Sequence, residues 1–223
     1  MLTRLDDSAR AALATAARRV AECGLVVGSA GNVSLRAGDR ILISCGGAEL
    51  ETLDPQDCLE VGLIDGRVAG TPGPEQRPSS ELTLHTAIYS ATDASAIVHT
   101  HSHYATVLGT IVDELPAVHY AVHRFGGPVR VAPYHTFGTE ELAFAVTEAL
   151  RDRSAALMAN HGAVVTGRDI ADAVSGAIQL EWLASIYYHA TVCGTPNILT
   201  DSELDAVRER ARQIRYGVEA GAR

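Results

Sequence analysis

The sequence predicts an α/β protein in which helices pack in layers on a largely antiparallel β-sheet. Strand-type and helix-type segments intermix along the 223 residues without the regular βαβ alternation of a Rossmann fold or a barrel. The chain is 47% apolar and 20% charged, which is ordinary for a globular protein. It contains no internal repeat and no low-complexity block. Together these observations predict one domain over residues 1–223.

The first half of the chain predicts a helix, a meander of strands and a second helix. Asp7 and Ser8 can cap an alanine-rich helix that ends near Gly24, with arginines in its last turns, where the helix dipole favours cations. Short β-type runs follow, separated by Gly, Asp and Pro, and a proline-rich surface loop precedes the next helix. We expect strands at 33–35, 41–44 and 59–64, the loop at 70–78 and the second helix directly after it.

The second half predicts further alternating segments. The apolar run 96–98 is typical of a buried strand, and Gly138-Thr139-Glu140-Glu141 is a good signal for the start of a helix. We expect additional strands at 117–122, 129–132, 155–158 and 163–166, and helices at 106–108, 139–151, 169–191 and 201–215.

The charge and hydropathy of the chain exclude several classes of protein. A formal net charge of −9 argues against binding along a nucleic-acid backbone, which requires a basic surface. No run of about eighteen uncharged apolar residues is present to span a bilayer. The first residues lack the apolar segment of a signal peptide, so we expect a cytoplasmic protein. A phosphorylated small molecule is still allowed as a ligand, because backbone N–H groups bind phosphate without a basic face.

The cysteines predict no disulfide framework and no zinc ribbon. They are widely spaced and form no C-x-x-C pair, so we expect buried, reduced thiols. The four are Cys23, Cys45, Cys58 and Cys193.

A pair of histidines follows the buried strand at 96–98. His99 and His101 are two residues apart, so both rings face the same side if the strand continues through them. Neutral imidazole is a good ligand for zinc and similar cations. Two ligands do not make a site, and His161, between Asn160 and Gly162, is a further candidate that spacing alone leaves undecided.

Pro78-Ser79-Ser80-Glu81 supports two interpretations. It is a good helix start, with a serine cap and an acidic residue in the first turn. It is also a possible anion site, since hydroxyls, free N–H groups and the positive end of a helix converge there. Gly46-Gly47 and Gly31-Asn32 could supply further backbone donors, although glycine-rich turns usually only turn the chain.

Taken together and in order, these motifs resemble the class II aldolase/adducin superfamily, most closely its fuculose-phosphate aldolase branch. The resemblance covers nearly the whole chain. The matching segments are Gly31-Asn32-Val33-Ser34, Leu42-Ile43-Ser44, Ser79-Ser80-Glu81, Val98-His99-Thr100-His101, Pro116-Ala117-Val118-His119-Tyr120, Ala132-Pro133-Tyr134, Phe137-Gly138-Thr139, His161-Gly162 and Tyr216-Gly217.

The resemblance implies a three-layer α-β-α fold, a homotetramer with the active site near a subunit boundary, and one zinc ion per subunit. His99, His101 and His161 would hold the zinc, and Glu81 would complete the resting coordination. The implied reaction is the reversible cleavage of a ketose 1-phosphate, such as L-fuculose 1-phosphate, to dihydroxyacetone phosphate and an aldehyde such as L-lactaldehyde. Glu81 would then be displaced and act as the general base or acid, and Tyr120 would protonate the aldehyde oxygen.

The same resemblance implies where the rest of the substrate binds. The phosphate would lie on Gly31, Asn32, Gly46, Gly47, Ser79 and Ser80, and Phe137 and Tyr216 would form a wall for the aldehyde. Two positions depart from the branch. Gly46 stands where a threonine is typical, which removes a hydroxyl from the phosphate site, and Gln213 stands where the fuculose enzymes carry an aromatic residue.

Other members of the superfamily remain as alternatives. Pentulose-phosphate 4-epimerases carry Asp at the position of Glu81 and use a further Asp where this chain has His123, so both residues disfavour epimerase chemistry. Sugar-acid phosphate decarboxylases and methylthioribulose-phosphate dehydratases share the zinc histidines and are not excluded by motif. A non-catalytic, adducin-like scaffold is disfavoured, because this chain keeps all three histidines and Glu81.

Overall fold

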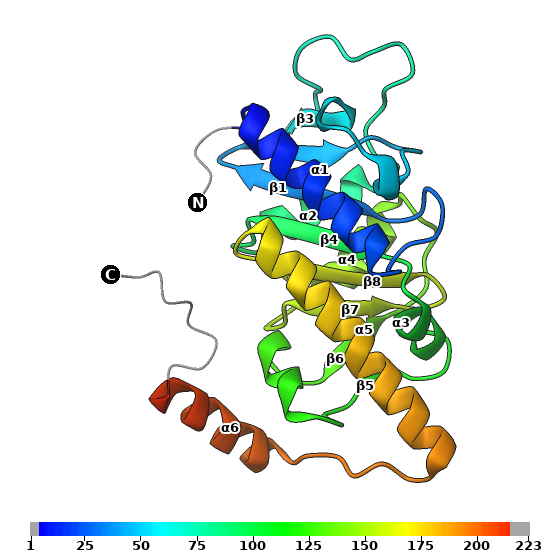
Figure 1. Ribbon diagram of the computed structural model, residues 1–223, viewed down its shortest axis with the longest axis vertical. Coiled ribbons are helices and arrows are strands. Elements are labelled where there is room, and N and C mark those ends of the chain that lie inside the picture. Colours follow the sequence, from blue (N-terminus) through cyan, green and yellow to red (C-terminus); the bar gives the residue numbers. More distant parts are fainter. Residues whose placement is uncertain (1–4, 215–223) are drawn as a thin grey trace.

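The computed structural model describes residues 5–214 and contains one eight-stranded sheet (Figure 1). Its strand order is β3-β2-β1-β4-β8-β7-β6-β5, and every pairing is antiparallel except β6 with β7. The prediction of a largely antiparallel sheet is confirmed. The strands are β1 (Asn32–Ala37), β2 (Arg40–Ser44), β3 (Cys58–Gly62), β4 (Ala96–Thr100), β5 (Glu114–Leu115), β6 (Val129–Ala132), β7 (Ala155–Met158) and β8 (Gly162–Gly167).

Helices cover both faces of this sheet. Helices α1 (Asp7–Glu22) and α5 (Ile170–Cys193) cross one face, with the short α3 (His103–Leu108) beside α5, whereas α2 (Leu82–Ala91) and α4 (Glu140–Ala149) cover the other (Figure 1). Alternate residues of one strand therefore enter two separate cores: in β4, Val98 packs under α1 and α5, and Ile97 packs under α2 and α4. The three-layer α-β-α arrangement is confirmed.

Side-chain caps explain where most of the helices begin. The Asp6 carboxylate accepts hydrogen bonds from the N–H groups of Ser8 and Ala9, so Asp6, and not the predicted Asp7 or Ser8, caps α1. Thr139 caps α4 and Asp169 caps α5, so each helix begins one residue after its predicted first residue. Gly24, shortly after α1, has a φ of 69°, a left-handed conformation that permits the chain to turn away.

One predicted strand, at 117–122, is wrong. The chain instead forms a 3₁₀ helix, η3 (Tyr120–Phe125), which the His119 ring caps by accepting a hydrogen bond from the N–H of Ala121. The residues Ala121, Val122 and Phe125 are buried with helical spacing, and a short apolar run does not distinguish this spacing from that of a buried strand. The strand that pairs with β6 is the two-residue β5, just upstream.

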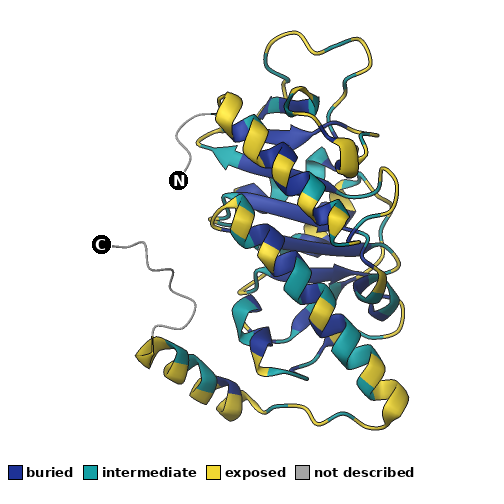
Figure 2. Cartoon of the chain, viewed as in Figure 1, coloured by how far each residue is buried: buried dark blue, intermediate teal, exposed yellow. Residues whose placement is uncertain are grey.

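The last helix described, α6 (Asp201–Gln213), lies apart from the layers and packs beside η3 (Figure 1). Leu204 is its one buried residue, and most of its surface is exposed (Figure 2). No helix among residues 5–214 combines the length and the apolar character needed to cross a membrane. All four cysteines lie in this range and none is paired; Cys45 and Cys58 are buried as predicted, whereas Cys23 is partly buried and Cys193 is exposed.

Candidate metal centre and substrate cavity

The register of the central strands brings the three histidines together. His99 lies in β4, which ends at Thr100, and His101 follows directly. Strand β8 runs antiparallel to β4, with Ala163 opposite Thr100, so His161, just before β8, arrives next to His101. Asn160 adopts a left-handed conformation (φ 55°) that turns the chain tightly between β7 and β8. Sheet pairing thus joins a strand-borne pair to a turn sixty positions away.

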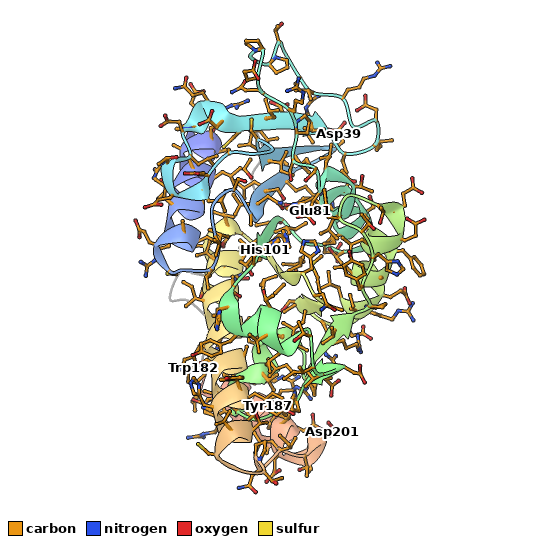
Figure 3. All side chains as sticks on the ribbon, turned by 90° about the vertical axis from the view of Figure 1, so that its right-hand side faces the viewer. Asp39, Glu81, His101, Trp182, Tyr187 and Asp201 are labelled. Atoms are coloured by element: carbon orange, nitrogen blue, oxygen red, sulfur yellow. The ribbon has the colours of Figure 1, made fainter. Side chains whose placement is uncertain are left out.

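Glu81, at the start of α2, completes the cluster. Its carboxylate Oε2 lies 2.9 Å from His99 Nε2, and its Oε1 lies 3.4 Å from His161 Nε2. The Nε2 atoms of His99 and His101 are 3.0 Å apart, and the four ligand atoms all lie within 4.8 Å of one another. Glu81 and His101 are seen side by side in the middle of the molecule in Figure 3. Ligand atoms about 3.4 Å apart are what tetrahedral zinc with bonds of about 2.05 Å requires.

The hydrogen bonds of the cluster fit a cation. His99 Nδ1 lies 3.0 Å from the carbonyl oxygen of Ala163, so this nitrogen carries a proton and donates it. Nε2 of His99 then faces the Glu81 carboxylate at 2.9 Å, and a proton or a metal ion between the two atoms holds them at this distance. Glu81 Oε1 is buried and has no hydrogen-bond partner in the described part of the chain. A metal ion would satisfy both atoms.

The electrostatics favour the protonation states that metal ligands need. Burial lowers the pKa of His101 to about 4, and burial likewise lowers the pKa of His161, so both rings are neutral near pH 7. Burial raises the pKa of Glu81, but the charge and hydrogen bond of His99, together with a hydrogen bond from Asn32, outweigh it and hold this pKa well below its usual range. The cluster therefore offers neutral imidazoles at His101 and His161 and an ionised carboxylate at Glu81.

The cluster forms one wall of a cavity of about 530 Å³. His99 is fully buried beneath the cavity, whereas His101, His161 and Glu81 reach its surface. The residues that line it are Val27, Ser29, Ala30, Gly31, Asn32, Cys45, Gly47, Ser79, Ser80, Glu81, His101, Tyr134, His135, Phe137, Asn160 and His161. The structure thus gathers the predicted metal ligands, five of the six predicted phosphate-binding residues and Phe137 in one place.

Close backbone packing shapes the predicted phosphate side. Gly31 has a φ of 84°, and a Cβ there would lie 2.6 Å from Val26 Cγ1 and 2.8 Å from the carbonyl oxygen of His99, so glycine is required. Gly46 packs against Pro78, and its N–H donates to the carbonyl of Arg77. Gly46 is absent from the cavity lining, which leaves Gly47 as the member of the pair that lines the cavity.

Glu81 is both a member of the cluster and the N-cap residue of α2, which corrects the predicted serine cap. The Ser79 hydroxyl accepts a hydrogen bond from the N–H of Glu81, and the Ser79 carbonyl accepts one from Leu82, so this serine orders the turn before the helix. The Glu81 side chain makes no capping bond and extends toward the histidines instead. Ser80 remains exposed at the cavity wall.

The remaining predicted residues lie elsewhere. Tyr120 is half-exposed on η3 and lines a separate apolar groove beside α6, away from the metal cluster of its own chain. Gln213 ends α6 and donates to Glu209. Tyr216 lies outside the described residues. His103 shares the two-residue spacing of His99 and His101 but is exposed at the start of α3, because the strand ends before it, and it lies outside the cluster.

Sequence reasoning missed several residues of the site. Tyr134 and His135 join Phe137 at the cavity, and Asn160, Ser29 and Cys45 also line it. Tyr134 and Phe137 are 61% and 63% exposed, so this mouth of the cavity is aromatic and open. Only tertiary structure places these loop residues there.

A model of the family described as the class II aldolase and adducin N-terminal domain matches residues 11–188. The chain belongs to this family. It is 39% identical over 203 residues to the 5-methylthioribulose-1-phosphate/5-deoxyribulose-1-phosphate aldolase of Rhodospirillum rubrum, covering 90% of each chain. It is 36% identical over 198 residues to the L-fuculose phosphate aldolase of Escherichia coli K12, covering 87% of this chain and 89% of that one.

Solved structures of the same family have the same fold as this chain. An L-fuculose 1-phosphate aldolase superposes with a TM-score of 0.86 at 32% identity, covering 93% of this chain and 97% of the other. A scaffold without catalysis would not need the buried Glu81 and histidine cluster, and this chain keeps it complete. This member of the class II aldolase/adducin family is therefore a lyase, and it has a candidate metal site.

Proposed function

We propose that the protein is a zinc-dependent class II aldolase that reversibly cleaves a ketose 1-phosphate to dihydroxyacetone phosphate and an aldehyde. One observation carries this proposal: the metal cluster and the Ser79-Ser80 turn, which offers neutral donors for an anion, line the same cavity. A ketose 1-phosphate has the complementary arrangement, because its phosphate is carried on C1, the carbon next to the C2 carbonyl. A cytoplasmic location and one zinc ion per subunit are part of the proposal.

A zinc ion held by His99, His101 and His161 would polarise the ketose carbonyl and stabilise the charge that develops as the C3–C4 bond breaks. Ser79, Ser80 and Gly47 bind the phosphate, with the N-terminal end of α2 directly after them. Glu81 moves a proton at the reacting carbon: in synthesis the ionised carboxylate removes a proton from the hydroxymethyl carbon of dihydroxyacetone phosphate, and in cleavage the protonated carboxyl returns it to the same carbon, C3, after the aldehyde has left.

The leaving aldehyde faces the aromatic mouth formed by Tyr134 and Phe137. This surface suits an aldehyde with a small apolar end, such as L-lactaldehyde from L-fuculose 1-phosphate or the aldehyde released from 5-deoxyribulose 1-phosphate. Both sugars terminate in a methyl group, and both occur in the names of the relatives described above.

Tyr120 would act from a neighbouring subunit of a homotetramer: in cleavage it would accept the proton of the C4 hydroxyl, and in synthesis it would return this proton to the aldehyde oxygen. Its hydroxyl does not line the cavity of its own chain, and it lies on an exposed apolar groove, as a residue at a subunit boundary would. The active site would then be complete only in the assembly.

The test is a product screen of the purified protein. Dihydroxyacetone phosphate is offered with a panel of aldehydes, and ribulose 5-phosphate and 3-oxo-tetronate 4-phosphate are offered separately. Carbon–carbon bond formation with the aldehydes supports the aldolase proposal. Release of carbon dioxide from the sugar acid, or epimerisation of the pentulose, without aldol product would replace it with the corresponding alternative.

Two variants test the roles within the site. Glu81→Gln should slow proton exchange at the hydroxymethyl carbon of dihydroxyacetone phosphate by about 10²- to 10⁴-fold, and near-normal exchange would remove Glu81 as the base. His99→Ala should lower the zinc content of the purified protein, whereas the exposed His103→Ala should retain it. Full zinc in both proteins would refute the ligand assignment.

A further inference from the structure

We infer that His85, a residue that the reaction as described does not use, is a positioning residue that fixes the orientation of the Asn32 amide toward Glu81 and the cavity. This inference rests on the proposed function where it concerns catalysis. Its structural part concerns a chain of buried hydrogen bonds and stands without that function.

The hydrogen bonds run from α2 to β1 and back. Tyr89 Oη lies 2.7 Å from Ser34 Oγ, and Ser34 Oγ lies 2.7 Å from His85 Nδ1. His85 Nε2 lies 2.5 Å from Asn32 Oδ1, and Asn32 Nδ2 lies 3.0 Å from Glu81 Oε2. All five side chains are buried, and His85 is fully inaccessible.

The sequence spacing explains why these groups meet. One face of α2 carries His85 and Tyr89, which follow the N-cap residue Glu81 at intervals of four residues. Asn32 and Ser34 are two apart and share one face of β1. Ser34 pairs with Ile43 and Ile97 in the adjacent strands, so its hydroxyl lies in an otherwise apolar layer, where leaving it without a partner would be costly.

The carboxylate fixes the direction of every hydrogen bond in this chain. An ionised Glu81 only accepts, so Asn32 presents its NH₂ group to Glu81 and its carbonyl oxygen to His85. Because that oxygen only accepts, His85 Nε2 carries the proton, and a neutral His85 then accepts at Nδ1 from the Ser34 hydroxyl. Tyr89 in turn donates to Ser34. Burial, together with the neighbouring charge of His99, lowers the pKa of His85 to about 3, in agreement with a neutral ring.

The consequence concerns the cavity. Asn32 lines it and belongs to the predicted phosphate site. With its carbonyl held by His85, its NH₂ group faces the cavity whether Glu81 is in its resting position or displaced. Without His85 the amide is free to rotate by about 180° and present an oxygen to an anionic carboxylate or phosphate, which is repulsive.

The first experiment reads the hydrogen-bond chain independently of catalysis. Zinc-loaded protein with ¹⁵N-labelled histidine is examined by two-bond ¹⁵N–¹H correlation, and His85 is assigned by its loss in His85→Gln. The result expected is a neutral ring protonated at Nε2. A ring protonated at Nδ1, or a charged ring, at pH 7 would overturn the inference.

The second experiment is a kinetic double-mutant cycle. His85→Leu should lower kcat/KM for aldol cleavage by about 10- to 100-fold at unchanged zinc content, with the larger part in KM if the phosphate contact dominates. In an Asn32→Ala background the same substitution should have almost no further effect, because His85 acts through Asn32. Equal losses in both backgrounds would overturn the inference.

Matched variants separate positioning from general destabilisation. His85→Gln restores a donor toward Asn32 and should recover most of the loss. Tyr89→Phe removes a buried hydroxyl at the far end but leaves Ser34 able to donate to His85, so its kinetic loss should be much smaller than that of His85→Leu. Equal losses in these three variants would indicate destabilisation only and refute the role. If the unmodified protein cleaves no ketose 1-phosphate, the proposed function fails, and the tautomer of His85 still decides the structural inference.

Discussion

Burial of a neutral histidine should make the stability of this protein depend on pH in a way that one substitution removes. The pKa of His85 falls from an ordinary value of 6.5 to about 3, first because the ring is completely buried and second because of the charge of His99. Between these two pH values His85 binds a proton in the unfolded chain and stays neutral in the folded chain. His85 therefore contributes stability that is fully present above pH 6.5 and is lost as the pH falls toward 3.

The size of this effect follows from the two pKa values. Between pH 7 and pH 4.5 the linkage relation gives a loss of about 2 to 3 kcal/mol from this residue alone. Titration of other groups in the cluster also lowers the free energy of unfolding over the same pH range. The comparison is therefore made with His85→Gln, which keeps those groups and cannot titrate at position 85. The free-energy difference between the two proteins should change by about 2 to 3 kcal/mol in favour of the variant on acidification.

The assay is urea unfolding at several pH values from 7 to 4.5. Zinc is removed from both proteins with a chelator, because metal affinity is itself pH-dependent, and both are compared at one protomer concentration because dissociation of an oligomer contributes to unfolding. A difference between the two proteins that stays constant over this range would refute the burial of a neutral His85.

Three further predictions concern the cavity. Gly31→Ala should destabilise the fold by about 2 to 4 kcal/mol, because the added Cβ would collide with neighbouring atoms. The control Gly28→Ala also has a positive φ but has open space around it, and should cost only about 1 to 2 kcal/mol. Equal thermal unfolding midpoints for the two variants would contradict this prediction. Mixing Glu81→Gln with Tyr120→Phe protein under conditions that exchange subunits should restore about a quarter of the native activity if each site takes these residues from adjacent subunits of a ring, and no recovery would place them in one chain. Phe137→Ala should raise KM for the aldehyde in the synthetic direction by about 3- to 10-fold without lowering the melting temperature, because Phe137 is 63% exposed; an unchanged KM would exclude it from the aldehyde pocket.

The candidate site divides into parts that are local in sequence and parts that are not. His99 and His101 are predictable as a pair because a strand repeats every two residues. The role of Glu81 and the third ligand depended on resemblance to a family, since nothing near His161 distinguishes it from other histidines. His85 was open to prediction, because it lies one helical turn after Glu81, but its partner Ser34 lies on a strand 51 positions earlier and could not be paired with it from sequence.

The sequence by itself determined the type of nearly every helix and strand, because apolar periodicity, glycines and capping residues act within a few positions of the chain. It failed at residues 117–122, where a short apolar run fits a strand and a helix equally well. In the structure part of this segment belongs to the 3₁₀ helix η3, which packs against α6. Tertiary structure alone decided the pairing of β4 with β8, which closes the histidine cluster, and the packing of Gly46 against Pro78, which removes this glycine from the cavity wall. These contacts join residues far apart in the chain, and they form only when burial of the two cores on either side of the sheet holds the strands in one register.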